Sequence, residues 1–303
     1  MIVSEKGVTG KFKKGVENVK NSIMKSGTQE KVFGGCEQQE QEGEVREEDI
    51  IDATSSSMLK KELEGRQSQI PLSAAPIIPA GPTGEEGAAE MISKFKKQPS
   101  QCLLLGNLDL ERVDAEWLNG VDVSVVQELQ LSFNKLENAS NFFLEKFCSL
   151  QVLHLQANKL TRFDSGLFML TNLKELDLSG NMIQEIPREV SKLTKLTKLC
   201  VPNNKISKIS PMIGHLKKLE EMDLNGNALE SVPHTFGNLV SLETLDLSFC
   251  CLKQLPEEVC FLTRLIQLNL GGNKLTSLPK SIGYLKRVVN CNVADNSLKG
   301  EKN

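Results

Sequence analysis

Residues 173–195 read LKELDLSGNMIQEIPREVSKLTK, and the same 23-residue pattern returns from Leu196, Leu219, Leu242 and Leu265 and, with valine in first place, from Val288. The most diagnostic position is an asparagine three residues after the second leucine of each L-x-L pair. It recurs after 24 residues and then six times after 23, with one cysteine in the series: Asn134, Asn158, Asn181, Asn204, Asn227, Cys250, Asn273 and Asn296. Eight blocks in phase establish an internal repeat.

Each position of the repeat has a physical reason. Leu176 and Leu178 alternate with polar residues, as in a strand that buries one face. Pro187 then interrupts regular hydrogen bonding and favours a short helical or 3₁₀ return. Repeats of 20–29 residues with L-x-x-L-x-L-x-x-N/C-x-L are leucine-rich repeats. The predicted fold is therefore an α/β leucine-rich repeat solenoid, a curved horseshoe with a parallel concave sheet and short helical or 3₁₀ returns.

One such repeat cannot stand alone, because it buries too few apolar side chains to offset the ordering of its backbone. Stacked repeats bury the strand leucines between layers, and each asparagine amide can satisfy backbone groups of the turn. We expect the leucine-rich repeat domain to cover residues 99–303, with about eight regular repeats. The segment CLLLGNLDLERV, residues 102–113, resembles a degenerate first repeat, in which Leu108 stands at the asparagine position.

Residues 83–98 are expected to form a helix that caps the first repeat. Thr83 and Glu86 have the T-x-x-E spacing of a capping box, and Met91, Ile92 and Phe95 supply an apolar face. At the other end, the last repeat stops at NVADNSLKGEKN without a return segment. The expectation is either a truncated chain or an edge that a partner or a second copy covers.

Residues 1–82 are expected to be a disordered arm. Its acidic, glutamine-rich stretch and its Pro- and Gly-punctuated linker cannot build a core. Within it, residues 11–25 read KFKKGVENVKNSIMK, a basic amphipathic pattern. This pattern is interpreted as a transient helix or as a docking helix for a partner or an anionic lipid surface. Membrane contact is expected only through this arm.

Composition bounds the class of function. The net charge of −3 gives no drive toward nucleic acid. The eight cysteines are scattered through the repeats instead of clustering at the ends of the array, and no apolar run is long enough for a signal sequence or a membrane span. These features favour a reducing, cytoplasmic environment.

The returns share a second feature, a proline that follows an aliphatic residue. Pro187, Pro233, Pro256 and Pro279 occupy this position, whereas the return after Asn204 has Pro211 one place later. This pattern resembles the intracellular Ras-group leucine-rich repeat proteins, which include Ras-suppressor-like and Scribble-like scaffolds, over about residues 99–303. The resemblance implies a non-enzymatic signalling adaptor whose protein partner is a small GTPase or a phosphatase.

Two columns of strand residues are expected to face the concave surface. Six acids and one lysine fall in these columns, which predicts an acidic middle of the horseshoe. Phe133 and Phe249, at strand ends, are candidate apolar anchors for a partner. The predicted partner-binding residues are Glu128, Glu175, Asp177, Lys198, Glu221, Asp223, Asp246 and Phe249. The alternative is that these positions are merely solvated.

The sequence offers no constellation for catalysis, for a cofactor or for a metal. It contains three histidines, His154, His215 and His234, and no phosphate-binding loop, H-E-x-x-H or C-x-x-C motif. Paired acids such as Glu175 and Asp177 lack the further oxygen ligands that calcium needs. The expectation is a protein that is not an enzyme.

The predicted function is a non-catalytic adaptor or scaffold in intracellular signalling that binds a protein on the concave face. The alternative is an anchoring protein at a membrane surface or the cytoskeleton that acts through the basic arm. A third hypothesis, a regulatory subunit that targets a phosphatase or a ligase, differs from the first only in its partner.

Overall fold

The computed structural model describes residues 82–138 and 144–299. The predicted arm, apart from its last residue, and the helix expected over residues 11–25 lie outside the described residues. Within the described residues, each repeat before the last contributes one strand, one turn at the ladder position and one return, and the last repeat contributes a strand and a turn.

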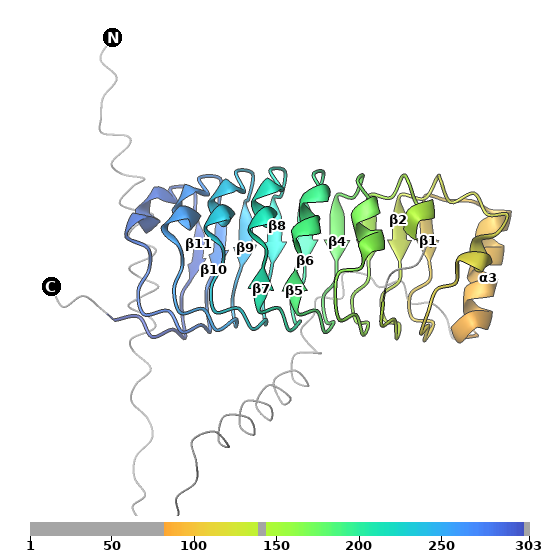
Figure 1. Ribbon diagram of the computed structural model, residues 1–303, viewed down its shortest axis with the longest axis horizontal. Coiled ribbons are helices and arrows are strands. Elements are labelled where there is room, and N and C mark those ends of the chain that lie inside the picture. The colour runs from red at the N-terminus through yellow and green to blue at the C-terminus, as the bar shows by residue number, and fades with distance from the viewer. Residues whose placement is uncertain (1–81, 139–143, 300–303) are drawn as a thin grey trace, which may run out of the picture. The chain divides into compact units, whose positions relative to one another are not determined.

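Nine strands form one parallel sheet, in which each strand pairs with the strand of the next repeat (Figure 1). In chain order the strands are β1 (Cys102–Leu104), β2 (Glu128–Gln130), β3 (Val152–His154), β4 (Glu175–Asp177), β6 (Lys198–Cys200), β8 (Glu221–Asp223), β9 (Thr244–Asp246), β10 (Gln267–Asn269) and β11 (Asn290–Asn292). The middle residue of each strand points inward, and Leu176, Leu199 and Leu245 are at most 1% exposed. The parallel sheet confirms the predicted fold class.

The degenerate first repeat joins the sheet in register. Leu103 pairs with Leu129 although the segment between them is longer than in the regular repeats. The longer segment is accommodated in the return, which contains the 3₁₀ helix Ala115–Leu118.

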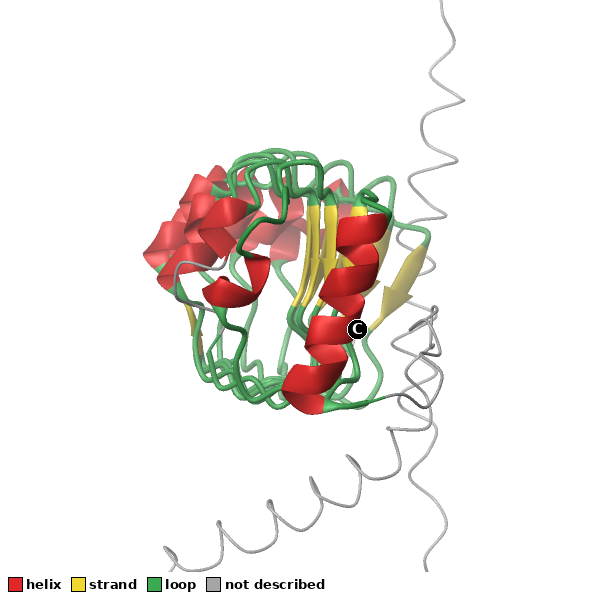
Figure 2. Cartoon of the chain, turned by 90° about the vertical axis from the view of Figure 1, so that its right-hand side faces the viewer, coloured by secondary structure: helices red, strands yellow, loops and turns green. Residues whose placement is uncertain are grey.

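The returns are 3₁₀ helices, as predicted, and Figure 2 shows them on the side of the array opposite the strands. After Ala115–Leu118 they are Leu144–Lys146, Ser165–Met169, Arg188–Lys192, Pro211–His215, His234–Asn238, Glu257–Phe261 and Lys280–Tyr284. Proline stands at the N-cap in four of them, where its fixed φ suits the helix start and no N–H is needed. A second sheet joins two returns through β5 (Glu185–Ile186) and β7 (Lys208–Ile209).

The ladder asparagines tie neighbouring layers together. The Asn204 side chain is typical: its Oδ1 accepts the Ile183 N–H at 3.0 Å, and its Nδ2 donates to the carbonyls of Leu178 and Val201 at 3.0 and 3.1 Å. These are backbone groups that the tight turn would otherwise bury without partners. The amide therefore stabilises two repeats at once.

The helix α3 (Gly84–Lys97) covers the first repeat, and its Ala88, Ile92 and Phe95 join the core of the array. The capping-box prediction is wrong in its detail, because the Thr83 side chain makes no cap hydrogen bond. The helix start is held by the array instead: the Gly84 N–H donates to the Leu108 carbonyl at 2.5 Å. At the far end Val293 is fully buried, while Cys291 and Leu298 are half-buried.

Candidate functional site

The outward side chains of the nine-stranded sheet form the sheet face. Parallel pairing in register aligns them into two rows, because every strand presents its first and third residue outward. In one row Glu175, Lys198 and Glu221 are direct neighbours. In the other, the order is Asp177, Cys200, Asp223 and Asp246.

Six of the predicted binding residues thus meet on four successive strands. We call them the acidic cluster: Glu175, Asp177, Lys198, Glu221, Asp223 and Asp246. Five carboxylates and one ammonium group give this cluster a formal charge of −4. Glu128 lies apart from it on β2, where its carboxylate accepts from Gln130 at 2.9 Å and lies 3.8 Å from His154 Nε2.

The single cation of the cluster is engaged by the cluster itself. Lys198 Nζ lies 2.9 Å from Glu221 Oε2. Burial acts to lower the pKa of Lys198, but the hydrogen bond to Glu221 and the charges of Glu221 and Glu175 outweigh it and raise the pKa above its ordinary value. Lys198 therefore stays charged and offsets part of the Glu175–Glu221 repulsion.

Each aspartate of the cluster accepts a hydrogen bond from the backbone N–H of the residue two positions later in the chain. Asp177 Oδ1 accepts from the backbone N–H of Ser179 at 2.9 Å and from its hydroxyl, and Asp246 Oδ1 accepts from the same groups of Ser248 at 2.8 and 2.5 Å. Asn269 Nδ2 adds a bond of 2.8 Å to Asp246 Oδ2. The D-L-S spacing of these repeats is the sequence signal for the two hydrogen bonds, although their formation was not predicted from it.

Asp223 is the carboxylate that the cluster perturbs most. Burial raises its pKa to about 6, the charges of Asp246, Glu221 and Asp177 add to this effect, and the backbone N–H of Asn225, 2.9 Å away, opposes it. The charge of this face consequently depends on pH near neutrality.

Phe249 lies at the rim of the acidic cluster, three residues after Asp246 and 41% exposed. The residue before every ladder position has a positive φ: Asn107, Phe133, Ala157, Gly180, Asn203, Gly226, Phe249, Gly272 and Asp295. Phe133, 40% exposed, holds the equivalent position in the repeat of Glu128, outside the cluster. Both rings are recognisable in the sequence as candidate anchors, whereas the left-handed backbone that presents them is not.

The thiol of Cys200 lies within the cluster but is not poised as a nucleophile. Burial, with the charge of Asp177 next in importance, raises its pKa to about 12, so the thiol stays protonated near neutral pH. His154 lies on β3, with β4 between it and Cys200. His215 and His234 lie on return helices. Among residues 82–138 and 144–299, no group of three or more His, Cys, Asp or Glu residues is arranged to hold a metal.

Comparison with known proteins agrees with this geometry. A family model described as Leucine rich repeat matches residues 148–206 and 194–252, and a second model of the same description matches residues 264–285. Together with the parallel sheet and the asparagine ladder, these matches show the leucine-rich repeat fold. No curated protein sequence matches the chain.

Solved structures with the same fold come from varied sources. A leucine-rich repeat protein of Leptospira interrogans, LIC12759, is 29% identical, with a TM-score of 0.57 over 67% of this chain and 57% of that one. The ectodomain of the Arabidopsis thaliana receptor kinase GASSHO1/SCHENGEN3, solved in complex with CASPARIAN STRIP INTEGRITY FACTOR 2, is also 29% identical, with a TM-score of 0.57 over 64% of this chain and 24% of that one. An internalin of Listeria monocytogenes, InlF, shares the fold at 21% identity and a TM-score of 0.53, over 70% of this chain and 69% of that one.

This chain thus spans less than two thirds of the first two matched structures. Among the described residues, no helix has the length and apolar character needed to cross a membrane.

Proposed function

We propose that the chain is a non-catalytic adaptor in intracellular signalling whose acidic cluster and Phe249 bind a basic surface of a partner protein. The observation that carries the proposal is the convergence of five carboxylates from β4, β8 and β9, while β6 between them supplies the one cation of the cluster, which is already paired to Glu221. A face of one sign attracts a partner of the opposite sign and sets its orientation. Phe249 supplies the exposed apolar contact that an anchor residue needs.

Two further facts support this function. Leucine-rich repeat arrays are protein-binding modules, and the similar Arabidopsis ectodomain is solved with a bound factor. The cysteines of the described residues are all free thiols, which suits a reducing cytoplasm. The Ras-group resemblance of the repeats makes a small GTPase or a phosphatase the first partner to test.

The test compares partner capture by the full chain with capture by an Asp177→Lys, Glu221→Lys, Asp223→Lys variant, using mass spectrometry of proteins from cell lysate. A matched control, Glu111→Lys, Glu116→Lys, Glu137→Lys, makes the same charge change at exposed positions outside the cluster. Circular dichroism checks that all three chains are folded.

Loss of specific partners from the cluster variant but not from the control supports the proposal, and the proteins lost identify the partner. Partners that bind both variants equally overturn it. If those partners are instead lost when Lys13, Lys14 and Lys20 are neutralised, the anchoring function through the basic arm replaces the adaptor function.

A further inference from the structure

The loops that lead from each return into the next strand form one edge of the array, which we call the rim (Figure 2). From residue 146 to residue 289 they are seven loops of equal length, each running from the last residue of a return to the residue before a strand. Against two acids, Glu220 and Glu243, they carry nine basic residues, which gives the rim a formal charge of +7: Lys146, Lys174, Lys192, Lys195, Lys217, Lys218, Arg264, Lys286 and Arg287.

The chain thus separates its charges, although its net charge is only −3. The sheet face is acidic and the rim is basic. Lys195 Nζ donates to Asn172 Oδ1 at 2.6 Å, and Lys217 Nζ donates to the Asn238 carbonyl at 2.9 Å. Both acceptors are uncharged, so these hydrogen bonds fix the side chains without neutralising them.

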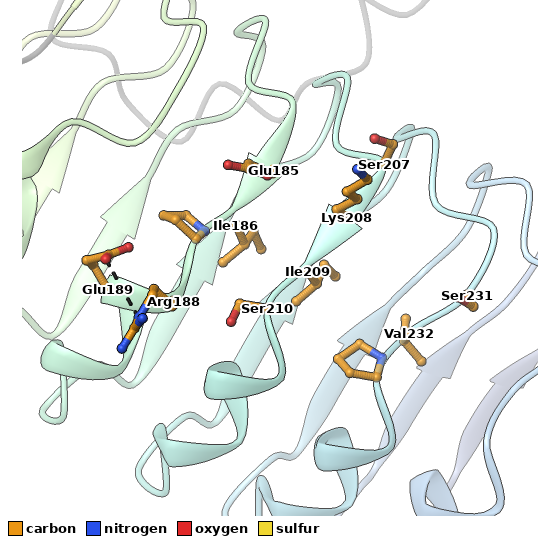
Figure 3. A pocket seen from close by; sticks show the side chains of 12 residues that line it. Glu185, Ile186, Arg188, Glu189, Ser207, Lys208, Ile209, Ser210, Ser231 and Val232 are labelled. Atoms are coloured by element: carbon orange, nitrogen blue, oxygen red, sulfur yellow. Dashed lines mark ion pairs between the residues drawn. The ribbon is translucent and has the colours of Figure 1, made fainter.

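The cavity beside the β5–β7 pair, with a volume of about 690 Å³, shows a different distribution of charge (Figure 3). Glu185 and Glu189 oppose Arg188 and Lys208 there, and Arg188 Nε lies 3.9 Å from Glu189 Oε1. Charges of both signs meet on that part of the returns and cancel. The excess of one sign is therefore a property of the rim and not of the returns in general.

Two rim loops also expose aromatic rings. Phe261 is 58% exposed and Tyr284 is 59% exposed, at equivalent positions of consecutive repeats. The fold does not require an aromatic residue at this position, because Lys192, His215 and Asn238 occupy it in other repeats and are also exposed. A position that accepts polar residues thus carries two rings in contact with water.

These two loops combine the rings with cations. We call their six exposed residues the rim patch: Phe261, Arg264, Tyr284, Lys286, Arg287 and Val289. The loops read FLTRLI (261–266) and YLKRVV (284–289), and neither contains an acidic residue. Phe261, Tyr284 and Lys286 line a cavity of about 400 Å³ between them. The patch therefore presents three positive charges and a continuous apolar surface together.

We propose that the rim patch docks the protein on an anionic phospholipid membrane. Phe261 and Tyr284 enter the headgroup region, and Arg264 and Arg287 meet lipid phosphates. Aromatic side chains beside Lys and Arg are typical of surfaces that bind the membrane interface. A phospholipid supplies both the phosphate and the apolar chain that such a patch needs. The other rim cations lie along the same edge and add to the attraction.

This orientation leaves the sheet face free. The strands begin at the rim and lead away from it, so the acidic cluster stands beside the membrane and is not pressed against it (Figure 2). An anionic surface repels carboxylates, which disfavours docking through the sheet face. A protein partner can therefore bind the acidic cluster while the rim holds the lipid surface. The sequence analysis expected membrane contact through the arm alone, and the rim patch provides a second contact.

Vesicle co-sedimentation of the full chain tests the charge requirement. Binding is expected to vesicles of phosphatidylcholine and phosphatidylserine in equal parts, to weaken with added salt, and to be absent with phosphatidylcholine alone. Arg264→Gln, Arg287→Gln is expected to lower the partition coefficient about ten-fold or more. The matched control, Lys205→Gln, Lys274→Gln, removes two exposed cations that follow ladder asparagines at the other edge of the array and is expected to change little.

The apolar contact is tested by substitution and by fluorescence. Phe261→Ser is expected to weaken vesicle binding about five-fold, and Phe133→Ser, which removes an exposed ring outside the rim, is the control. Trp117 is the only tryptophan of the chain, so a Trp117→Phe, Phe261→Trp variant carries a single fluorophore in the patch. Its emission is expected to shift to the blue when anionic vesicles are added, whereas that of Trp117 in the unaltered chain stays constant.

Several outcomes overturn the proposal. They are an absence of vesicle binding, an equal loss in the arginine variant and its lysine control, and a tryptophan at residue 261 whose emission does not change. Binding that is lost only when Lys13, Lys14 and Lys20 are neutralised assigns the membrane contact to the arm. If the arginine variant loses captured proteins and the unaltered chain binds no vesicles, the ligand of the rim is an acidic protein.

The test is independent of the sheet-face function. The Asp177→Lys, Glu221→Lys, Asp223→Lys variant is expected to bind anionic vesicles at least as well as the unaltered chain. The arginine variant is expected to capture the partners of the acidic cluster as before. Circular dichroism checks that each variant is folded, so failure of the rim and failure of the sheet face are distinguishable.

Discussion

The ring of Phe249 lies over Gly272, the residue at the equivalent position of the next repeat. A Cβ placed at Gly272 would stand 2.5 Å from Cδ1 and 2.6 Å from Cε1 of the ring. Both residues have a left-handed backbone, with φ of 51° at Phe249 and 66° at Gly272. The ring keeps 41% of its surface exposed in this position. The missing side chain of Gly272 thus leaves the space that the Phe249 ring of the previous repeat occupies.

Gly272→Ala is expected to destabilise the fold by about 1–2 kcal/mol, because alanine pays for the left-handed backbone and the Phe249 ring must also move. The matched control is Gly180→Ala, where φ is 64° but the nearest atom to the added Cβ is 3.7 Å away. Urea unfolding of both variants separates the two contributions. An equal loss at both positions would show that the ring contact contributes nothing.

Phe249→Ala is expected to weaken binding of the partner at least ten-fold while leaving the fold intact, because the ring is exposed beside the acidic cluster. Phe133→Ala removes an equally exposed ring at the same position of another repeat, away from the cluster. Titration calorimetry with the identified partner measures both. If Phe133→Ala weakens binding as much as Phe249→Ala, the partner covers the whole sheet face and Phe249 is not its anchor.

The fold was predictable because periodicity and ladder spacing encode it directly. The asparagine recurs with its leucines, and a repeat that must stack has one way of burying them, so strands, returns and order follow from spacing alone. The row order of Glu175, Lys198 and Glu221 follows in the same way, because pairing in register converts equivalent repeat positions into neighbours. Even the long first repeat keeps this register, since Leu103 still has to be buried beside Leu129.

Features that depend on a contact between repeats were not predictable in this way. The Thr83–Glu86 spacing suggested a capping box, but the carbonyl of Leu108 occupies the helix start. The late Pro211 was visible in the sequence, whereas its consequence, the β5–β7 pair, needs the neighbouring return. Burial of Asp223 similarly depends on both flanking strands. The sequence therefore locates the acidic cluster but does not predict the raised pKa of Asp223.

Asp223→Asn is expected to stabilise the protein at pH 7.5 by about 1–2 kcal/mol and to have little effect at pH 4. The pKa of Asp223 is about 6 in the folded protein and 3.8 without the fold. Between these values the folded state binds a proton that the unfolded state lacks, so this group lowers stability as pH rises from about 4 to 6. Asparagine removes the titration and can still accept the Asn225 N–H.

Urea unfolding of the wild type and Asp223→Asn at pH 4, 5, 6 and 7.5 measures this difference. The same titration predicts weaker binding of a basic partner as pH falls through 6, since the cluster then loses one negative charge. A stability difference that does not change with pH would contradict the assignment of the shift to Asp223.

Cys250→Asn is expected to stabilise the protein by about 1 kcal/mol, because Cys250 is the one position without an amide in the ladder from Asn134 to Asn296. Asn227 and Asn273 accept the Ile206 and Leu252 N–H groups at 2.9 Å, and the residue at the corresponding place before Cys250 is Leu229. The Cys250 thiol donates to the Leu224 carbonyl at 3.2 Å, but it offers the Leu229 N–H no oxygen acceptor. Burial raises the pKa of the thiol to about 12, so a thiolate does not serve instead.

Asn227→Cys is the reverse control. It is expected to lower the free energy of unfolding by about 1–3 kcal/mol, since it leaves the Ile206 N–H without its amide acceptor. Urea unfolding measures the free energy of unfolding of both variants. Amide hydrogen exchange shows where the change occurs: protection of the Leu229 N–H should rise in Cys250→Asn, and protection of the Ile206 N–H should fall in Asn227→Cys. A Cys250→Asn chain that gains no stability and shows unchanged Leu229 exchange would mean that the layers at this point tolerate the thiol without loss. The ladder amide would then be replaceable there by any small side chain that fits the turn.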